Sequence, residues 1–128
     1  MITKTVLCDA DFLIALCIVN EPNHELAKEI LAKYNHFVVL NITFYEVATV
    51  LSRKLIQPEA VDTLERIQEA FCNVIYFLPI NEFQTFKLYK SFTKKNISFF
   101  DCACSITARN NDFLIASFDK FYPLQILA

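Results

Sequence analysis

Apolar and polar residues follow one another along this chain in a pattern that predicts alternating strands and helices. Short runs of apolar and β-branched residues predict buried strands at residues 5–8, 37–40, 74–78 and 113–117, and a short fifth strand at 124–127. Helical spacing of apolar residues begins at about residue 12 and returns over about 24–32, 43–55, 58–71, 81–92 and 98–109. Residues suited to helix starts precede several of these segments. They are Asn23, Thr43, Asn81 and Ser98 as caps, and Pro58 in a first turn.

This order of elements is typical of the α/β class. Strands that alternate with helices form a mostly parallel sheet, and the helices then cover both of its faces. We therefore expect a three-layer sandwich with a central sheet of about five strands, formed by residues 1–128 as a single domain. In such a fold, ligands bind at the carboxyl ends of the strands.

Composition narrows the class of protein without naming a substrate. Apolar residues make up 55% of the chain, enough for an ordinary core, yet none of the apolar runs is long enough to cross a bilayer. The N-terminus lacks the features of a secretory signal, so we expect a cytoplasmic protein. The net charge of −2 neither indicates nor excludes an enzyme that acts on nucleic acid, because acidic metal ligands can mask a basic rim.

Glycine and cysteine usage exclude several enzyme classes. The chain has no glycine, which rules out a P-loop, a glycine-rich dinucleotide turn and a Gly-x-Ser-x-Gly nucleophile elbow. The five cysteines are odd in number and include no Cys-x-x-Cys pair, so we interpret them as reduced and structural. A zinc site is not expected, because His24 and His36 have no ligand-like spacing to them.

Four acidic residues lie where a parallel sheet would bring them together. Asp9 directly follows the first predicted strand, and Asp119 lies two residues past the fourth. Glu46 and Asp101 each lie three residues into a predicted helix. Converging carboxylates repel one another unless a cation neutralises them, and Mg²⁺ or Mn²⁺ prefers carboxylate oxygens and also binds phosphate. The pattern therefore indicates metal-dependent hydrolysis of a phosphodiester.

Each of these acids also has a purely structural interpretation. Glu46 and Asp101 occupy the third position of capping boxes that start at Thr43 and Ser98. Asp119 suits a surface turn, and either Asp9 or its neighbour Asp11 can cap the first helix. Spacing alone does not choose between these interpretations and a metal site.

Five segments of the chain resemble the PIN-domain nucleases, and in particular the toxin subunits of VapBC-type toxin–antitoxin pairs. The segments are Val6-Leu-Cys-Asp-Ala-Asp-Phe-Leu-Ile-Ala-Leu16, Pro22-Asn-His-Glu-Leu-Ala-Lys28, Thr43-Phe-Tyr-Glu-Val-Ala-Thr-Val-Leu51, Ile97-Ser-Phe-Phe-Asp-Cys-Ala103 and Leu114-Ile-Ala-Ser-Phe-Asp-Lys-Phe121. They occur in the order and in the kind of element that the family has. Together they span the chain, which makes the resemblance more specific than any one of them.

The resemblance implies a site, a cofactor and partners. It assigns Asp9, Glu46, Asp101 and Asp119 as catalytic and metal-binding acids, with Ser117 as a supporting hydroxyl. It implies Mg²⁺ or Mn²⁺, single-stranded RNA as substrate, a homodimer and a small antitoxin that blocks the site. Asp11 departs from the family, which more often has Ser, Thr or Asn there to hold the first aspartate. Asp11 either widens the metal site or caps the helix, and we favour the cap.

Two basic residues and two competing functions complete the hypotheses. Lys94 and Lys95 precede the helix of Asp101, where they can bind RNA phosphates or simply remain solvated. Asp9 and Asp11 also resemble the opening motif of haloacid-dehalogenase-like phosphatases, although the glycine-rich turns of that class are missing. A PIN-like module that binds without turnover is the other alternative. Metal-dependent cleavage of RNA distinguishes the nuclease from both.

Overall fold

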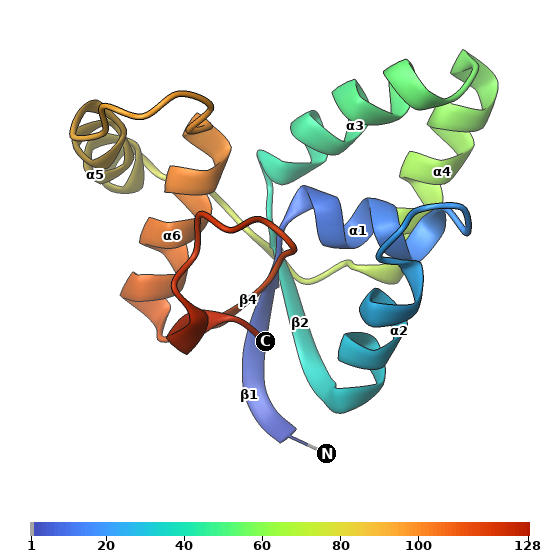
Figure 1. The fold of residues 1–128 in the computed structure, drawn as a ribbon, viewed down its shortest axis with the longest axis horizontal. Coiled ribbons are helices and arrows are strands. Elements are labelled where there is room, and N and C mark those ends of the chain that lie inside the picture. The colour runs from blue at the N-terminus through green and yellow to red at the C-terminus, as the bar shows by residue number, and fades with distance from the viewer. Residues whose placement is uncertain (1) are drawn as a thin grey trace.

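The computed structural model describes the backbone of residues 2–128, and its strands and helices alternate as expected (Figure 1). The strands are β1 (Ile2–Cys8), β2 (Tyr34–Leu40), β3 (Val74–Ile75) and β4 (Leu114–Ala116). The helices are α1 (Ala10–Cys17), α2 (His24–Lys33), α3 (Thr43–Lys54), α4 (Gln57–Ala70), α5 (Pro79–Lys90) and α6 (Phe99–Asn111), followed by the short 3₁₀ helix η1 (Leu124–Ile126).

The four strands form one parallel sheet in the order β3-β2-β1-β4. Strand β1 is central, and its Val6 pairs with Phe37 of β2 on one side and with Leu114 of β4 on the other. Strands β1 and β4 are therefore neighbours although about a hundred residues separate them in the sequence. The predicted α/β class with a parallel sheet is confirmed.

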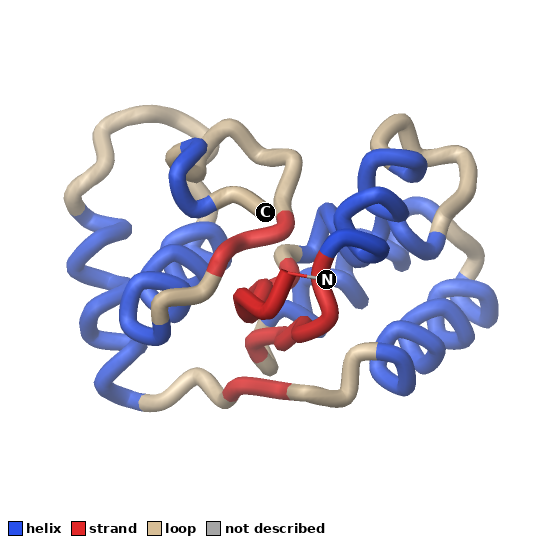
Figure 2. The backbone as a smooth tube through the Cα atoms, turned by 90° about the horizontal axis from the view of Figure 1, so that it is seen from below, coloured by secondary structure: helices blue, strands red, loops and turns tan. Residues whose placement is uncertain are grey.

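Helices cover both faces of the sheet, which gives the three layers visible in Figure 2. Alternate residues of β1 point to opposite faces: Val6 and Cys8 pack in a cluster with α1 to α4, whereas Leu7 packs in a cluster with α6. We call these the α1–α4 side and the α5–α6 side. All three β1 side chains are fully buried, as expected for a central parallel strand.

The C-terminal end differs from the short fifth strand expected at 124–127. Pro123 precedes η1, and the Leu127 amide donates to the Leu124 carbonyl at 3.2 Å, closing a 3₁₀ turn. Only Leu127 forms a bridge with Ile115 of β4, and the Ala128 amide donates to the Ile115 carbonyl at 2.8 Å. A proline has no amide to donate to a neighbouring strand, which favours the turn.

Two predicted helix caps concern the helices that carry Asp101 and Glu46. One of these caps is confirmed and the other is wrong. The Ser98 hydroxyl accepts hydrogen bonds from the Phe100 and Asp101 amides at 2.9 and 3.3 Å, so Ser98 caps α6 as predicted. The predicted capping box at Thr43 is wrong, because α3 has Ile42 in the cap position and no side-chain cap. Glu46 therefore has no capping role that would explain its position.

Two further features were expected from composition. Within residues 2–128, none of the helices combines the length and the apolar character needed to span a membrane. All five cysteines are free, and Cys8, Cys102 and Cys104 are buried while Cys17 and Cys72 are exposed. Cys104 lies 3.9 Å from the hydroxyl of the fully buried Thr43, which joins α6 to the start of α3.

Candidate active site

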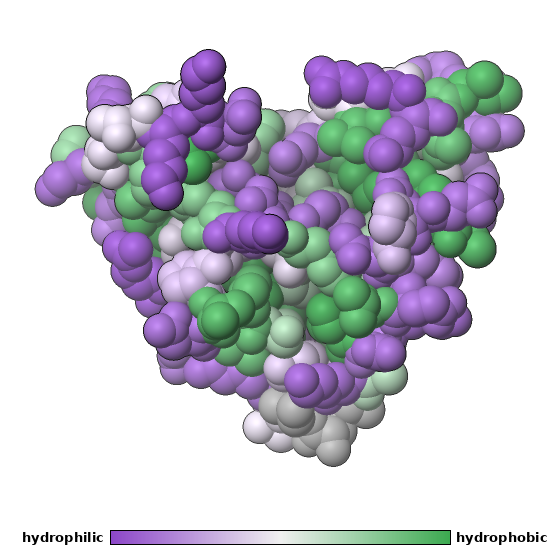
Figure 3. All heavy atoms as spheres, viewed as in Figure 1, coloured by the Kyte–Doolittle hydropathy of each residue, from purple (hydrophilic) through white to green (hydrophobic). Residues whose placement is uncertain are grey.

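Three helices begin at the carboxyl edge of the sheet, and each brings an acidic residue there. Asp9 follows β1 and is the N-cap of α1, while Glu46 and Asp101 lie in the first turns of α3 and α6. In Figure 1 these helix starts lie near one another above the strands. In the space-filling view, the outline of the molecule dips between helices α5 and α6 on one side and helices α3 and α4 on the other (Figure 3). A helix N-terminus carries partial positive charge, so the edge favours anionic groups and anionic ligands.

Asp9 is the most constrained of the acids, with only 3% of its surface exposed. Its Oδ1 accepts a hydrogen bond from the Ala10 amide at 2.8 Å. Its Oδ2 accepts from the Ser117 hydroxyl and from the Tyr122 hydroxyl, each at 3.1 Å. Burial raises the pKa of Asp9, and these three donors act in the opposite direction by stabilising the carboxylate.

The segment after β4 is bound to the start of α1 through Ser117. The Ser117 hydroxyl lies 3.1 Å from Asp9 Oδ2 and 3.2 Å from Asp11 Oδ2, and it can donate its single proton to only one at a time. The same oxygen accepts from the Asp119 amide at 3.0 Å, and Asp11 Oδ2 accepts from the Phe118 amide at 3.0 Å. Asp11 thus holds this segment. The helix cap that we favoured for Asp11 is provided by Asp9 instead.

Tyr122 is part of this site, although no pattern in the sequence predicted it. Its side chain is 3% exposed, and its hydroxyl lies 3.1 Å from Asp9 Oδ2 and 3.4 Å from the main-chain oxygen of Asp101. Burial raises the pKa of Tyr122 far above its ordinary value, so the phenol remains a donor. A tyrosine between Phe121 and Pro123 in a turn has no periodic pattern that would predict its burial.

The carboxyl groups lie within electrostatic reach of one another. Burial, together with the charge on Asp9, raises the pKa of Asp101 to about 7, of Glu46 to about 8 and of Asp11 to about 6. Asp119 is exposed at the rim, and its charge adds to the raised pKa of Asp9, Glu46 and Asp101. The structure therefore brings the four predicted acids to one place.

The donor chemistry fits a hard divalent cation. Among the residues that the structure describes, Glu46 Oε1 and Asp11 Oδ1 are buried and have no hydrogen-bond partner. A buried carboxylate oxygen without a partner costs free energy that a bound cation would offset. Across residues 2–128, no three His, Cys, Asp or Glu side chains form a ready-made metal cage. The fit therefore rests on the all-oxygen donor set and on the two unpaired oxygens.

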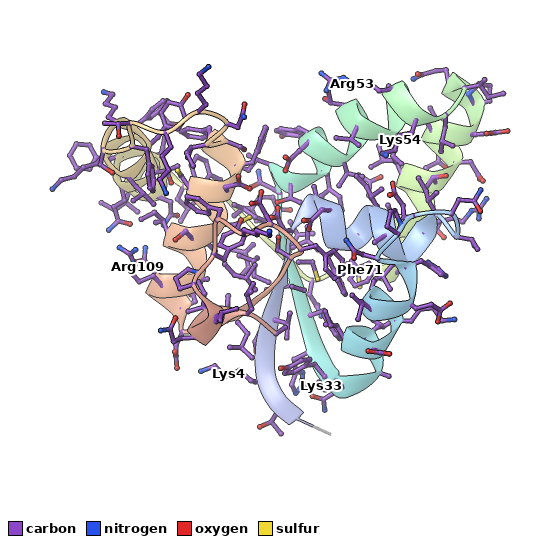
Figure 4. The ribbon with its side chains drawn as sticks, in the orientation of Figure 1. Lys4, Lys33, Arg53, Lys54, Phe71 and Arg109 are labelled. Carbon is purple, nitrogen blue, oxygen red and sulfur yellow. The ribbon has the colours of Figure 1, made fainter. Side chains whose placement is uncertain are left out.

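The basic residues lie outside this cluster. Lys94 and Lys95 are exposed in the loop between α5 and α6, and of the two only Lys94 lines a groove, which it shares with Arg109 of α6. Arg109 projects from the far end of α6, and Arg53 from the far end of α3 (Figure 4). Lys54 pairs with Glu21 at 2.9 Å. None of these cations neutralises the acids directly within the described residues.

Fold, sequence and edge geometry together define the class of protein. Residues 6–122 match the family model of the PIN domain, so the chain belongs to the PIN-domain family, a family of nucleases. Its structure is similar to those of the VapC toxins of VapBC toxin–antitoxin systems. No protein of curated function matches the chain significantly. The family match also sets aside the phosphatase alternative.

Three solved structures illustrate the similarity. VapC20 of Mycobacterium tuberculosis, a toxin that cleaves the sarcin–ricin loop, has a TM-score of 0.79 at 21% identity over 91% of each chain. A toxin–antitoxin complex from Klebsiella pneumoniae gives 0.69 at 16% identity over 96% of this chain and 95% of that one. FitAcB from Neisseria gonorrhoeae gives 0.68 at 18% identity over 89% and 87%. At these identities the similarity defines the fold alone.

Proposed function

We propose that the protein is a metal-dependent endoribonuclease that hydrolyses RNA phosphodiester bonds at Mg²⁺ or Mn²⁺. Asp9, Glu46, Asp101 and Asp119 would hold the metal. The observation that carries this proposal is the unpaired Glu46 Oε1, buried within the field of the other acids and free of any capping role. If the four acids had only structural roles, the burial of this oxygen without a hydrogen-bond partner would have no explanation.

The bound metal would activate a water molecule and stabilise negative charge on the phosphate in the transition state. Residues of the protein would orient the carboxylates that hold the metal and the attacking water. Ser117 and Tyr122 fix the Asp9 carboxylate through two hydrogen bonds, and Tyr122 also reaches the main chain of Asp101. Glu46 Oε1 offers a free acceptor that can orient the attacking water. Asp119 is exposed at the rim, where it would be accessible to incoming RNA.

We also propose that the protein is the toxin of a type II toxin–antitoxin pair. Similar structures include a toxin–antitoxin complex from Klebsiella pneumoniae and VapBC2 from Rickettsia felis bound to a promoter fragment. This chain has apolar side chains that a small antitoxin can cover: Leu26 and Leu31 on α2 are 50% and 41% exposed, and Val61 on α4 is 44% exposed. The complex would be cytoplasmic, where RNA and reduced cysteines are found.

A homodimer is the second expected assembly. Around the start of α5, Leu78, Ile80 and Phe83 are 54%, 63% and 69% exposed, an unusual density of large apolar groups on a monomer surface. A second copy of the chain would cover them, and the mass of the protein in solution tests this. We further propose that residues 1–128 form one domain, because both hydrophobic clusters pack on the same sheet.

The deciding experiment is RNA cleavage by wild type and Asp101→Asn in Mg²⁺, Mn²⁺ or EDTA. Asparagine preserves the size of the side chain and the Ser98 cap, so the variant should fold while it binds metal poorly. We expect metal-dependent cleavage by wild type and a loss of at least about 10²-fold in the variant. Equal cleavage by both proteins would contradict the four-acid site. Metal-dependent RNA binding without cleavage by either would favour the binding module.

A further inference from the structure

A groove of about 430 Å³ lies beside the acid cluster, on the α5–α6 side. It is formed by the loop between α5 and α6, by one face of α6 and by the segment after β4. Three basic residues from these parts of the chain line it: Lys94, Arg109 and Lys120. A second hollow shares Arg109 and adds Lys87 of α5. Cations that are distant in the sequence are thus gathered on one surface.

The charge of the groove is uncompensated by the protein itself. None of the residues that line these two hollows is an Asp or a Glu. Within residues 2–128, none of the four cations has a carboxylate within ion-pair distance, whereas Lys4, Lys28, Lys54 and Arg66 each do. All three of the cations that line the groove are exposed. Such a surface attracts a polyanion.

Helix α6 and the segment after β4 contribute residues both to the groove and to the acid cluster. Asp101, Ser105 and Arg109 are spaced four residues apart, so they follow one face of α6, and Ser105 and Arg109 both line the groove. Arg109 lies eight residues, or about 12 Å along the helix axis, beyond Asp101. Lys120 directly follows Asp119 at the rim. A strand whose scissile phosphate lies at the acids would therefore place later phosphates in the groove.

Aromatic side chains at the groove suit a single strand better than a duplex. Phe92 and Phe121 line it and pack edge to face, with ring centroids 5.5 Å apart. Phe92 is 36% exposed, so part of its ring is open to solvent. Exposed aromatic rings beside cations are the combination that binds single-stranded nucleic acid, since bases stack on the ring while cations contact the phosphates.

We propose that this groove binds the phosphates of the RNA strand on one side of the cleavage point, through Lys94, Arg109 and Lys120. The proposal rests on the proposed ribonuclease function and adds a substrate subsite to it. It also explains how a chain of net charge −2 with an acidic centre holds RNA: attraction in the groove offsets repulsion at the acids. Lys95, which does not line the groove, has no part in this subsite.

Binding of a labelled single-stranded RNA in EDTA tests the groove apart from catalysis. The test protein carries Lys94→Gln, Arg109→Gln and Lys120→Gln. The matched control carries Lys33→Gln, Arg53→Gln and Lys95→Gln, which change the net charge equally at exposed positions that, within residues 2–128, form no ion pair and do not line the groove. We expect the groove variant to bind at least about tenfold more weakly, and its salt dependence to lose about 2 from the slope of log K against log salt.

The single variants sharpen the assignment, because Lys94→Gln should weaken binding and Lys95→Gln should not. Equal losses in the groove and control triple variants would overturn the proposal, since net charge alone would then account for binding. Unchanged RNA binding by the groove variant would also overturn it. Failure of wild type to cleave RNA in Mg²⁺ would contradict the proposed function, yet a selective binding loss in EDTA would still support the subsite.

Discussion

The two sides of the sheet differ in how they use their apolar residues. On the α1–α4 side, large side chains such as Phe12, Leu13, Leu51 and Ile67 are fully buried. On the α5–α6 side, most of the buried residues of α6 are small, and α5 buries only Thr85 while its apolar residues remain partly exposed. We infer that the first side supplies most of the stability, while the second leaves surface for binding. The acids lie between the two.

The largest expected effect tests the stability of the α1–α4 side. Phe12 is fully buried and stacks on Phe37 with ring centroids 6.2 Å apart. Phe12→Ala should lower the free energy of unfolding by about 4 kcal/mol, because it removes a large side chain from a packed core. Phe86→Ala on α5 is the control: Phe86 is 43% exposed, and about 1 kcal/mol is expected. Similar losses in urea unfolding would remove the distinction between the two sides.

The next effect concerns the acids between the sides. Burial and neighbouring charges raise the pKa of Glu46 from its ordinary 4.5 to about 8. The folded state therefore binds the Glu46 proton more tightly than the unfolded state, and stability is lost as the pH rises from 4.5 through 8. Glu46→Gln should therefore stabilise the metal-free protein by roughly 2 kcal/mol above pH 8, a value reduced for the partial exposure of the side chain.

Thermal unfolding against pH in EDTA measures this difference. The advantage of Glu46→Gln should disappear as the pH falls to about 4.5, where Glu46 is protonated in both states. Added Mg²⁺ should stabilise wild type more than the variant, because it binds only the folded site. A variant that is less stable than wild type at every pH would mean that Glu46 has a structural partner instead of a metal.

A smaller effect is expected at Tyr122, which connects the α5–α6 side to Asp9. Tyr122→Phe removes one donor from Asp9 and should cost about 1.5 kcal/mol of stability and about tenfold in kcat/KM. The Tyr122 hydroxyl lowers the pKa of Asp9, so its removal should shift the acidic limb of the pH–rate profile to higher pH. Tyr89→Phe, at a 42% exposed position, serves as the control. Lower stability with an unshifted pH profile would assign Tyr122 a packing role only.

The smallest effect is expected at the amino end of the sheet. Lys4 on β1 pairs with Asp112 at the end of α6 at 2.9 Å, and the two side chains are 38% and 93% exposed. A double-mutant cycle with Lys4→Met and Asp112→Asn should give a coupling of at most about 0.5 kcal/mol. Asparagine suits the left-handed backbone of Asp112, which has φ 56°. A coupling above about 1 kcal/mol would mean that this exposed pair fixes α6 against the sheet.

Local patterns in the sequence predicted the elements well, and their failures have physical causes. Ser98 caps α6 as predicted, since a serine side chain satisfies the free amides of the helix that follows it. The capping box at Thr43 failed because tertiary packing buries Thr43 against Cys104. Residues 124–127 have the composition of a strand, but they form a 3₁₀ turn. They follow Pro123, which cannot donate a hydrogen bond to a strand, and they lie beside β4, the last strand of the sheet.

The residues of the candidate site likewise include some that local patterns predicted and some that they did not. That Asp9 and Asp119 follow strands, and that Glu46 and Asp101 begin helices, was visible in the sequence. Asp11 and Tyr122 were misjudged or missed, because their partners are distant: Asp11 holds the Phe118 amide, and Tyr122 holds Asp9 across 113 residues. Hydrogen bonds of this kind leave no periodic trace in the sequence.

The sequence by itself determined the order of strands and helices, the absence of glycine-dependent sites and the four acids at element ends. These features depend on local propensity and on the periodicity of apolar residues, which neighbouring residues carry. Only the tertiary structure decided that β4 pairs beside β1, and that Ser117 and Tyr122 therefore reach Asp9. The same packing gathers Lys94, Arg109 and Lys120 in one groove. Such contacts depend on strand order and on the packing of side chains from distant segments, which no local pattern encodes.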